Sequence, residues 1–279
     1  MAGRGTGPDF VEALARGLDV LRAFSSRQPV MSLADVAEAT DLARPTARRL
    51  LLTLEELGYV RTLDRGFALT PRVLSLGMAY IGALGLWDVA RPHLEALASA
   101  TGESSSMAQL DGSDIVYVAR AAVPKIIALR VEIGTRFPAL QTSQGKVLLA
   151  ALSETELATA LAQPSRSGLP AVPRDSGSVS VELASVRTRG WALADEELAP
   201  GIRSVAVPVR DGSGVRAAMN VTVHAAETSV GRLVEEHLPR LQRAAGAIGD
   251  DWALWQSRPL VEVARGTGIT ARGVDGSGS

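Results

Sequence analysis

Cysteine is missing from the chain, and lysine occurs at only two of its 279 positions, Lys125 and Lys146. The lack of cysteine excludes disulfides, thiolate catalysis and zinc sites built on cysteine. No apolar run is long enough to span a membrane, and the N-terminus lacks the charged-then-apolar order of a signal peptide. We therefore expect a protein of the cytoplasm that has no membrane partner.

A large excess of charge of either sign is also lacking, because the formal net charge is −1. Residues 1–80 carry ten Lys/Arg and nine Asp/Glu, so even this part has a net charge of only +1. Any DNA-binding signal must therefore lie in the placement of charges. With 46% apolar residues, the chain is long enough to form two domains with cores of their own.

The N-terminal part predicts three helices. Apolar residues recur at three- and four-residue spacing over Phe10–Phe24, including Val11, Leu14, Leu18 and Leu21, which is typical of an amphipathic helix. Ser32 fits the N-cap of a second helix, with Asp35 completing a capping box. After a turn over residues 40–43, Pro45 fits the first position of a third helix, and Gly58 follows its end.

The third helix has an apolar face and a charged face. The face predicted to be buried consists of Ala47, Leu50, Leu51, Leu54 and Leu57. On the other face arginines occupy the first half and glutamates the second, so DNA would attract the N-terminal half. A recognition helix enters the major groove in that orientation. An ordinary solvated helix explains the same charges, and the pattern alone leaves both alternatives open.

Residues 59–69 read as a short hairpin around the Gly66 turn. Helix, helix-turn-helix and hairpin follow one another in the order of a winged helix domain. Arginines on the wing would lie near phosphates or the minor groove. The predicted DNA-binding residues are Ser32, Arg44, Pro45, Thr46, Arg48, Arg49, Arg61 and Arg65.

Three stretches together resemble the N-terminal domain of IclR-type bacterial transcriptional regulators: Arg16-Gly17-Leu18, the run from Ser32 to Val60, and Phe67–Gly77. The phrase RPTARRLLLTLEELGYV, followed by a wing and LTPRVLSLG, is the most specific part. The resemblance covers roughly residues 10–257. It implies a DNA-binding regulator with a GAF-like effector domain.

The chain therefore divides into five parts. We expect disorder over 1–9, a winged helix domain over 10–70, a linker helix over 71–85, an effector-binding domain over 86–257 and a disordered tail over 258–279. The linker helix is apolar on most sides, so it should contact more than one neighbour, including a partner subunit. A plain core helix remains the alternative.

The effector domain is predicted to be α+β, with a mostly antiparallel sheet whose strands are joined largely by hairpins. Its strands are predicted at Ser105–Leu110, Ile115–Arg120, Ile126–Val131, Trp191–Leu193, Ile202–Arg210 and Val215–His224. Its helices are predicted at Trp87–Ala100, Gln144–Leu152, Glu154–Ala162, Val181–Arg189 and Val230–Trp255, the last interrupted or entered near Pro239. Gly134–Ser143 and Pro164–Ser178 are predicted to be loops.

Two stretches could hold a ligand. Thr142-Ser143 opens a helix, where free backbone N–H groups and the helix dipole favour an anion such as a carboxylate. Gly145 would let the ligand approach the backbone. On the strand Ala217–His224, Asn220 and Thr222 share one face. A capped helix without a ligand and a solvated sheet face are the alternatives.

The resemblance implies that effectors bind over this strand and beside the helix-opening loop. Carried over by position, the effector-binding residues are Thr142, Ser143, Gly145, Asp195, Ser204, Asn220 and Thr222. The wording around Gly134–Gly145, Glu197–Val209 and Asn220–His224 resembles regulators of protocatechuate, 4-hydroxybenzoate and β-ketoadipate-pathway genes. Their effectors are aromatic acids or the dicarboxylates derived from them. Lys146 stands where these regulators often have an arginine, and Leu140 stands where they often have an aromatic residue. Both departures from the family pattern lie beside the expected pocket.

Other chemistries find little support. His93, His224 and His237 lack the spacing of metal ligands. Ser143 lacks the Gly-x-Ser-x-Gly frame of a nucleophile elbow, and the adjacent acids Asp195–Glu197 fit a solvated loop. We therefore expect no metal, no cofactor and no enzymatic activity; a hydrolase would require turnover of an ester or amide.

These patterns predict a transcriptional regulator whose binding to double-stranded operator DNA is modulated by a small carboxylate effector. Because one recognition helix covers few base pairs, we expect a homodimer or a homotetramer on a two-half-site operator. The effector would act by changing the spacing of the winged helices through the linker helix. The alternative is a ligand-binding protein whose helix-turn-helix contacts other proteins.

Overall fold

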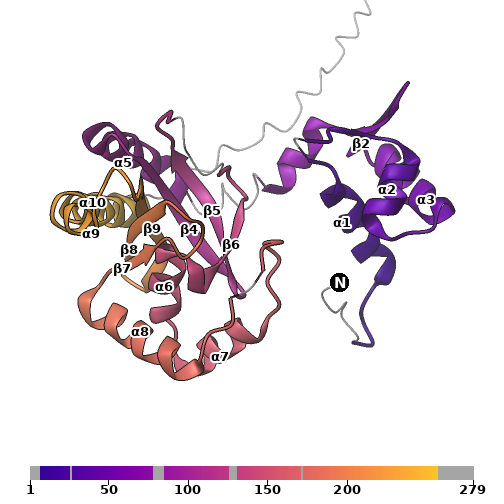
Figure 1. Ribbon diagram of the computed structural model, residues 1–279. Coiled ribbons are helices and arrows are strands. Elements are labelled where there is room, and N and C mark those ends of the chain that lie inside the picture. Colours follow the sequence, from indigo (N-terminus) through magenta and orange to yellow (C-terminus); the bar gives the residue numbers. More distant parts are fainter. Residues whose placement is uncertain (1–6, 26, 78–84, 126–130, 171, 257–279) are drawn as a thin grey trace, which may run out of the picture.

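The computed structural model describes residues 7–25, 27–77, 85–125, 131–170 and 172–256 (Figure 1). Within this part the chain forms an N-terminal helical unit with a small sheet and a larger α+β unit. Residues 126–130 of the predicted strand Ile126–Val131, much of the predicted linker helix and the predicted tail lie outside the described residues. No helix in the described ranges is long and apolar enough to cross a membrane.

The N-terminal unit has the predicted winged helix layout. Its helices are α1 (Glu12–Ala23), α2 (Leu33–Thr40) and α3 (Arg44–Glu56). A three-stranded antiparallel sheet in the order β1-β3-β2 completes it, formed by β1 (Val30–Met31), β3 (Gly66–Leu69) and β2 (Val60–Leu63). β1 was not predicted, because two residues are too few to show an alternating pattern.

Caps fix the ends of these helices. The predicted capping box starts α2: the Asp35 amide donates to Ser32 Oγ at 3.2 Å, and the Ser32 amide donates to the Asp35 carboxylate at 2.8 Å. Asp41 ends α2 in the left-handed region at φ 54°. Helix α3 begins at Arg44, so Pro45 is its second residue rather than the predicted first.

The burial of two helices corrects the predicted faces. Val20 of α1 and Phe24, which follows the helix, enter the core, whereas Val11 and Leu14 of the predicted apolar stripe are about 60% exposed. The helix was predicted correctly but its buried face was not, because the core lies against its C-terminal end. On α3, Leu57 is also exposed because it is the C-cap residue, beyond the last helical turn.

The start of the predicted linker helix is a single 3-10 turn, η1 (Pro71–Val73). Thr70 caps this turn by accepting from the Arg72 amide at 3.3 Å, and its hydroxyl donates to the Gly58 carbonyl at 2.5 Å. Residues 74–77 are helical, and residues 78–84 lie outside the described ranges.

The larger unit is built on a six-stranded antiparallel sheet in the order β6-β5-β4-β9-β8-β7. Its strands are β4 (Ser104–Asp111), β5 (Asp114–Ala121), β6 (Arg136–Pro138), β7 (Ala192–Asp195), β8 (Ile202–Asp211) and β9 (Gly214–His224). This confirms the α+β prediction. β6 and the following 3-10 turn η2 (Ala139–Gln141) occupy a stretch that was predicted to be a loop.

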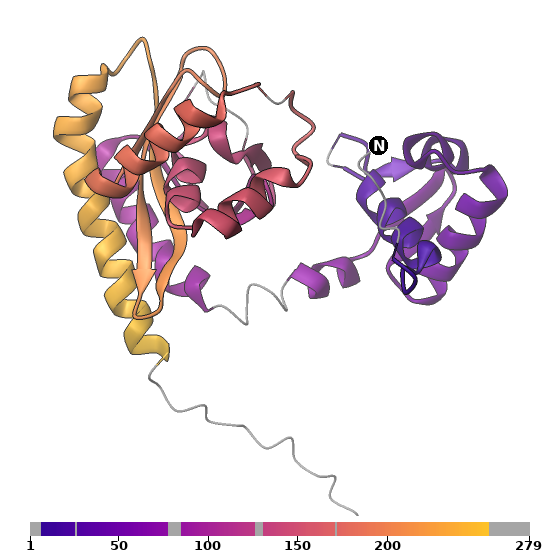
Figure 2. The same ribbon diagram turned by 90° about the horizontal axis from the view of Figure 1, so that it is seen from below.

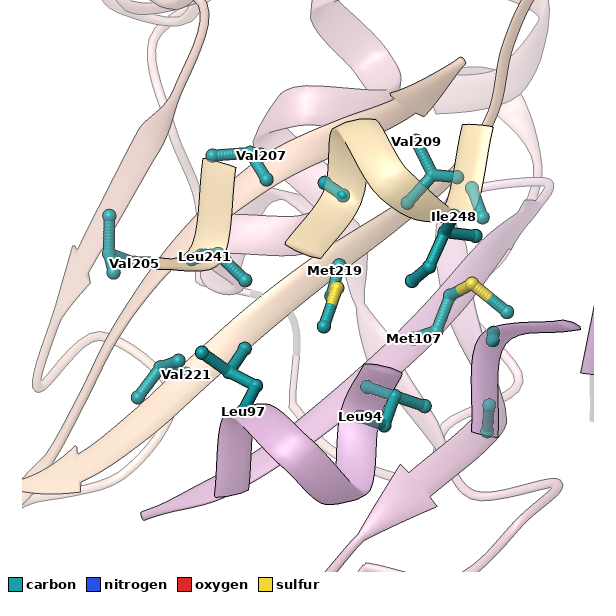
Figure 3. Close-up of a cluster of buried hydrophobic side chains, with 14 of the residues drawn as sticks. Leu94, Leu97, Met107, Val205, Val207, Val209, Met219, Val221, Leu241 and Ile248 are labelled. Carbon is teal, nitrogen blue, oxygen red and sulfur yellow. The ribbon is translucent and has the colours of Figure 1, made fainter. Parts of the chain in front are cut away.

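Helices cover both faces of the sheet (Figures 1 and 2). One face carries α5 (Leu86–Thr101) and α10 (Leu238–Gln256), the latter preceded by α9 (Val230–Arg232) and one π-helical turn, η3 (Leu233–His237), which matches the predicted interruption. The other face carries α6 (Ser143–Ala150), α7 (Glu154–Ala162) and α8 (Ser176–Arg189). Figure 3 shows Leu94 and Leu97 of α5 and Leu241 and Ile248 of α10 packing on the sheet around Met219.

Candidate functional site

The first half of α3 presents a positively charged surface. Arg44, Arg48 and Arg49 are exposed, and no carboxylate among the described residues forms an ion pair with them. Ala47, Leu51 and Leu54 on the opposite face are buried in the core of the N-terminal unit. The helix is therefore held by its apolar face, while three arginines are free to meet an anionic partner such as DNA.

The second half of α3 is tied to the wing. Glu55 Oε1 accepts a hydrogen bond from the Thr62 amide of β2 at 2.9 Å, so this carboxylate positions the hairpin. Arg61 and Arg65 are exposed on that hairpin. Of the other predicted DNA-binding residues, Pro45 is exposed and Thr46 half-buried, whereas the hydroxyl of Ser32 is used as the cap of α2.

A pocket lies on the α6 side of the sheet. It is bounded by strands β4, β5, β8 and β9, by the η2–α6 junction and by residues that follow β7. Four of the predicted effector-binding residues line it: Thr142, Ser204, Asn220 and Thr222. Ser143 lies directly behind them, with its Oγ 2.8 Å from Ser204 Oγ.

Gly145 is absent from the pocket lining, and its role differs from the predicted one. A Cβ atom at this position would lie 2.1 Å from the Ala139 carbonyl oxygen, so glycine is needed for η2 to pack against the first turn of α6. Thr142 caps the same turn, since its Oγ1 accepts from the Gly145 amide at 3.1 Å. Gly145 thus shapes the wall that carries Thr142 without facing a ligand.

Gly145→Ala should lower the free energy of unfolding by about 3 kcal/mol, the upper end of the usual cost of overpacking, because its backbone neighbour cannot rotate away. Gly246→Ala is a matched control, because this glycine also lies in a helix and a Cβ there meets nothing within 4 Å. It should raise stability by about 0.5–1 kcal/mol. Urea denaturation followed by circular dichroism measures both, and equal effects of the two substitutions would contradict this role.

Asp195 also lies outside the pocket. In β7 Ala194 faces the pocket, and the alternation of the strand turns Asp195 to the opposite face. There its carboxylate pairs with Arg203 at 2.6 Å. The neighbouring acids have partners as well: Glu196 accepts from the Gly201 amide at 2.8 Å, and Glu197 belongs to an ion network.

That network surrounds Lys146, which is completely buried and does not line the pocket. Its ammonium lies 2.6 Å from Glu182 Oε1 and 2.5 Å from Glu197 Oε1, and it donates to the Leu193 carbonyl at 3.1 Å. Arg174 pairs with the second oxygen of each glutamate. Burial raises the pKa of Glu182, but the hydrogen bonds and charges of Lys146 and Arg174 outweigh it, so the pKa is lowered.

The two predicted departures beside the pocket are therefore structural. Lys146 anchors α6 to α8 and to the stretch after β7. Leu140 packs against the core between the sheet and helices α6–α8. Neither side chain lines the pocket.

Arg120 was not predicted, yet it is the cation that the pocket offers. Burial lowers the pKa of its guanidinium, because the charged form is partly removed from water. Among the described residues it has no carboxylate partner; its Nη1 donates to Ser106 Oγ at 3.4 Å. Lys125 also lines the pocket, but its ammonium is already paired with Glu103 at 2.7 Å and with Glu227 at 2.9 Å.

Asn220 and Tyr117 contribute uncharged polar groups to the same pocket. Asn220 Nδ2 donates to Thr222 Oγ1 at 3.0 Å, whereas its Oδ1 is buried without a partner in the described part of the chain. Burial raises the pKa of Tyr117 to about 12, although the charge of Arg120 and the amide of Asn220 act in the opposite direction. In the described ranges, no cluster of three or more His, Asp or Glu side chains could hold a metal ion.

Two family models match the chain. The IclR helix-turn-helix domain matches residues 13–68, and the C-terminal domain of the bacterial transcriptional regulator IclR matches residues 78–250. The two matches coincide with the winged helix unit and the sheet unit described above.

Among curated proteins, the chain is 38% identical over 241 residues to the Pca regulon regulatory protein of Pseudomonas putida, covering 85% of this chain and 83% of that protein. A putative transcriptional regulator from Rhodococcus sp. RHA1 has a similar structure, with a TM-score of 0.75 and 45% identity over 88% of this chain and 100% of that one. The inducer-binding domain of a PobR double mutant from Acinetobacter, complexed with 3-hydroxybenzoic acid, matches with a TM-score of 0.51 and 31% identity. It covers 57% of this chain and 95% of that chain.

Proposed function

The chain belongs to the IclR family of bacterial transcriptional regulators, and on that premise we propose that a small aromatic carboxylate, held by Arg120, controls its binding to operator DNA. DNA is contacted by the first half of α3 and by Arg61 and Arg65 of the wing. The role of the chain is regulatory rather than catalytic. The α3 arginines without ion-pair partners support the DNA part of this proposal, and the pocket supports the effector part.

The observation that carries the effector part is the half-buried guanidinium of Arg120. Its burial destabilises the charged form, and no carboxylate of the described chain compensates for this. A bound carboxylate would do so through charge-assisted hydrogen bonds, which are about twice as strong as neutral ones. Val131, Leu198 and Ile202 add apolar walls that suit a ring. The 3-hydroxybenzoic acid bound by the related PobR domain agrees with this chemistry.

Arg120→Met should weaken the binding of an aromatic acid about 10- to 100-fold, because a hydrogen bond to a charged group contributes about 1.5–3 kcal/mol. Titration calorimetry of the full chain with 3- and 4-hydroxybenzoate measures this. Arg243→Met is the control, since this exposed arginine of α10 lies outside the pocket. Unchanged affinity in Arg120→Met would contradict the anchoring role.

Specific binding to operator DNA requires two copies of the chain. One recognition helix reads only a few base pairs, so a specific operator needs two half-sites and a homodimer or homotetramer. The effector would act by changing the spacing of the two winged helices. DNase footprinting with and without a bound acid tests this. A footprint and an affinity that stay the same for every acid that binds would exclude control by an effector.

A further inference from the structure

A second cavity lies beside the pocket that Arg120 lines. It is bounded by α7, by the start of α8, by η2 and by the segment between α7 and α8, residues 164–170 and 172–174, which we call the strap. Its volume is about 710 Å³. Sites for small molecules usually measure about 300–1,000 Å³, so this cavity is large enough to hold a ligand of its own.

Helix α7 turns an incompletely covered apolar face to this cavity. Five residues at three- and four-residue spacing form the face, and all of them line the cavity: Glu154, Leu157, Ala158, Leu161 and Ala162. Leu157 and Leu161 pack against the core between the sheet and helices α6–α8 but stay half-buried. From the strap, Val172 lines the same cavity and is 55% exposed. An apolar molecule bound here would remove these side chains from water.

The strap is tethered along its length. Near its start, Ser165 Oγ donates to the buried carboxylate of Asp114 at 2.6 Å. In its middle, Gln141 Nε2 donates to the Pro170 carbonyl at 3.3 Å. At its end, Arg174 is held by the ion network described above. Because this wall is already ordered, a ligand that binds against it loses little conformational entropy.

The charges around the cavity disfavour a carboxylate. Among the described residues, the ionisable groups that line it are Glu154 and Arg174. Arg174 already pairs with two glutamates, and Glu154 is an exposed carboxylate. An anion would therefore leave water without a free cation to compensate for the loss. Ser113 adds an uncharged polar group, since its Oγ is buried without a partner in the described part of the chain. These features suit an uncharged, mainly apolar molecule.

We propose that this cavity is a second ligand site, which takes an uncharged aromatic or apolar small molecule and alters the affinity of the Arg120 pocket. Two connections carry the coupling. Gln141 lines both cavities and holds the strap. Arg174 is tied to Glu197, whose neighbour Leu198 lines the Arg120 pocket. The binding part is independent of the proposed function, whereas the coupling part rests on it.

The binding part is tested on the full chain with N-phenyl-1-naphthylamine, an uncharged probe whose fluorescence rises in apolar surroundings. Its binding should saturate. Ala158→Trp fills the cavity from an exposed position of α7, so it should weaken binding about tenfold or more while circular dichroism shows the fold intact. Ala184→Trp is the matched control, because this exposed alanine of α8 lies outside the cavity. It should leave the affinity within about twofold of the parent.

Two results would overturn the binding part: no saturable binding to the parent, or equal affinity in the parent and in Ala158→Trp. A third would be a change of oligomeric state in Ala158→Trp, measured by sedimentation velocity, in a chain whose parent binds no probe. The cavity would then be a contact between copies of the chain.

The coupling part is tested by repeating the probe titration at increasing concentrations of 4-hydroxybenzoate. The affinity for the probe should change about fivefold or more and then reach a plateau, and the probe should change the affinity for the acid by the same factor. Displacement of the probe without a plateau would place both ligands in one pocket and overturn the proposal. Probe binding that the bound acid leaves unchanged overturns the coupling. If no acid binds, the proposed function fails, while the probe still decides whether the second site exists.

Discussion

Lys146→Met is expected to lower the free energy of unfolding of the sheet unit by about 3–5 kcal/mol, because it leaves buried charge without its partner. The Lys146 side chain is 1% exposed, and its ammonium pairs with one oxygen of Glu182 and one of Glu197. Without it, Arg174 alone faces two carboxylates, and the Leu193 carbonyl loses its donor. Urea denaturation followed by the near-ultraviolet circular dichroism of the tryptophans measures the change.

The other lysine of the chain is a natural control. Lys125 also pairs with two glutamates, but its side chain is 27% exposed and one partner, Glu227, is 60% exposed. Water screens the pair with Glu227, whereas Glu103 is 9% exposed, so Lys125→Met should cost less than Lys146→Met without being neutral. If both substitutions cost the same, burial of the network does not determine its contribution to stability. A Lys146→Met protein within 1 kcal/mol of the parent would lead to the same conclusion.

Local signals predicted the elements well. The capping box at Ser32 placed the start of α2, and Ser153 as an N-cap placed α7 with its observed bounds, Glu154–Ala162. The glycine-rich turn between β8 and β9 fixed a hairpin whose pairing runs from Ile202 with His224 to Asp211 with Gly214. Such signals involve residues within a few positions of one another, so a single sequence contains them.

Two features were harder to predict: which face of an element is buried, and which residues pair with one another. Both depend on contacts between segments that are distant in the sequence. The stripe of α1 around Leu14 has the right spacing for a helix, but only the position of the core decides which face is buried. Asp195 and Ala194 are adjacent in sequence and lie on opposite faces of β7, so a one-residue error moves the wrong side chain into the pocket.

The candidate site was predicted in part for the same reason. Thr142, Ser204, Asn220 and Thr222 were placed by resemblance and do line one pocket. Arg120 lies near the end of β5, and nothing in the neighbouring sequence distinguishes it. Its place in the pocket appears only once β5 pairs with β4 and β4 with β9. Lys146 follows the helix-opening loop and was expected to lie beside the pocket, but its partners come from α8 and from the stretch after β7.

The double substitution Arg48→Ala/Arg49→Ala should lower operator affinity at least 100-fold, because each arginine at a base or phosphate contributes about 1–3 kcal/mol. Both side chains are exposed on the first half of α3, whereas Ala47 and Leu51 of the same helix are buried. Removing them should therefore leave the fold intact, which circular dichroism checks. Fluorescence anisotropy with labelled operator DNA over a range of salt concentrations measures the loss.

The salt dependence of DNA binding distinguishes a DNA-reading role of α3 from a role in protein contacts. Each lost phosphate contact should reduce the slope of log affinity against log salt by about one. Residues 1–80 have a net charge of only +1. Long-range attraction between the rest of this unit and DNA therefore cannot compensate for the loss of two arginines. A dimer on a two-half-site operator loses four arginines. The loss of affinity for the whole operator should therefore exceed the loss for a single half-site. Arg243→Ala, in the sheet unit, should leave both affinity and slope unchanged, and a double variant that behaves like it would exclude α3 as the DNA-reading helix.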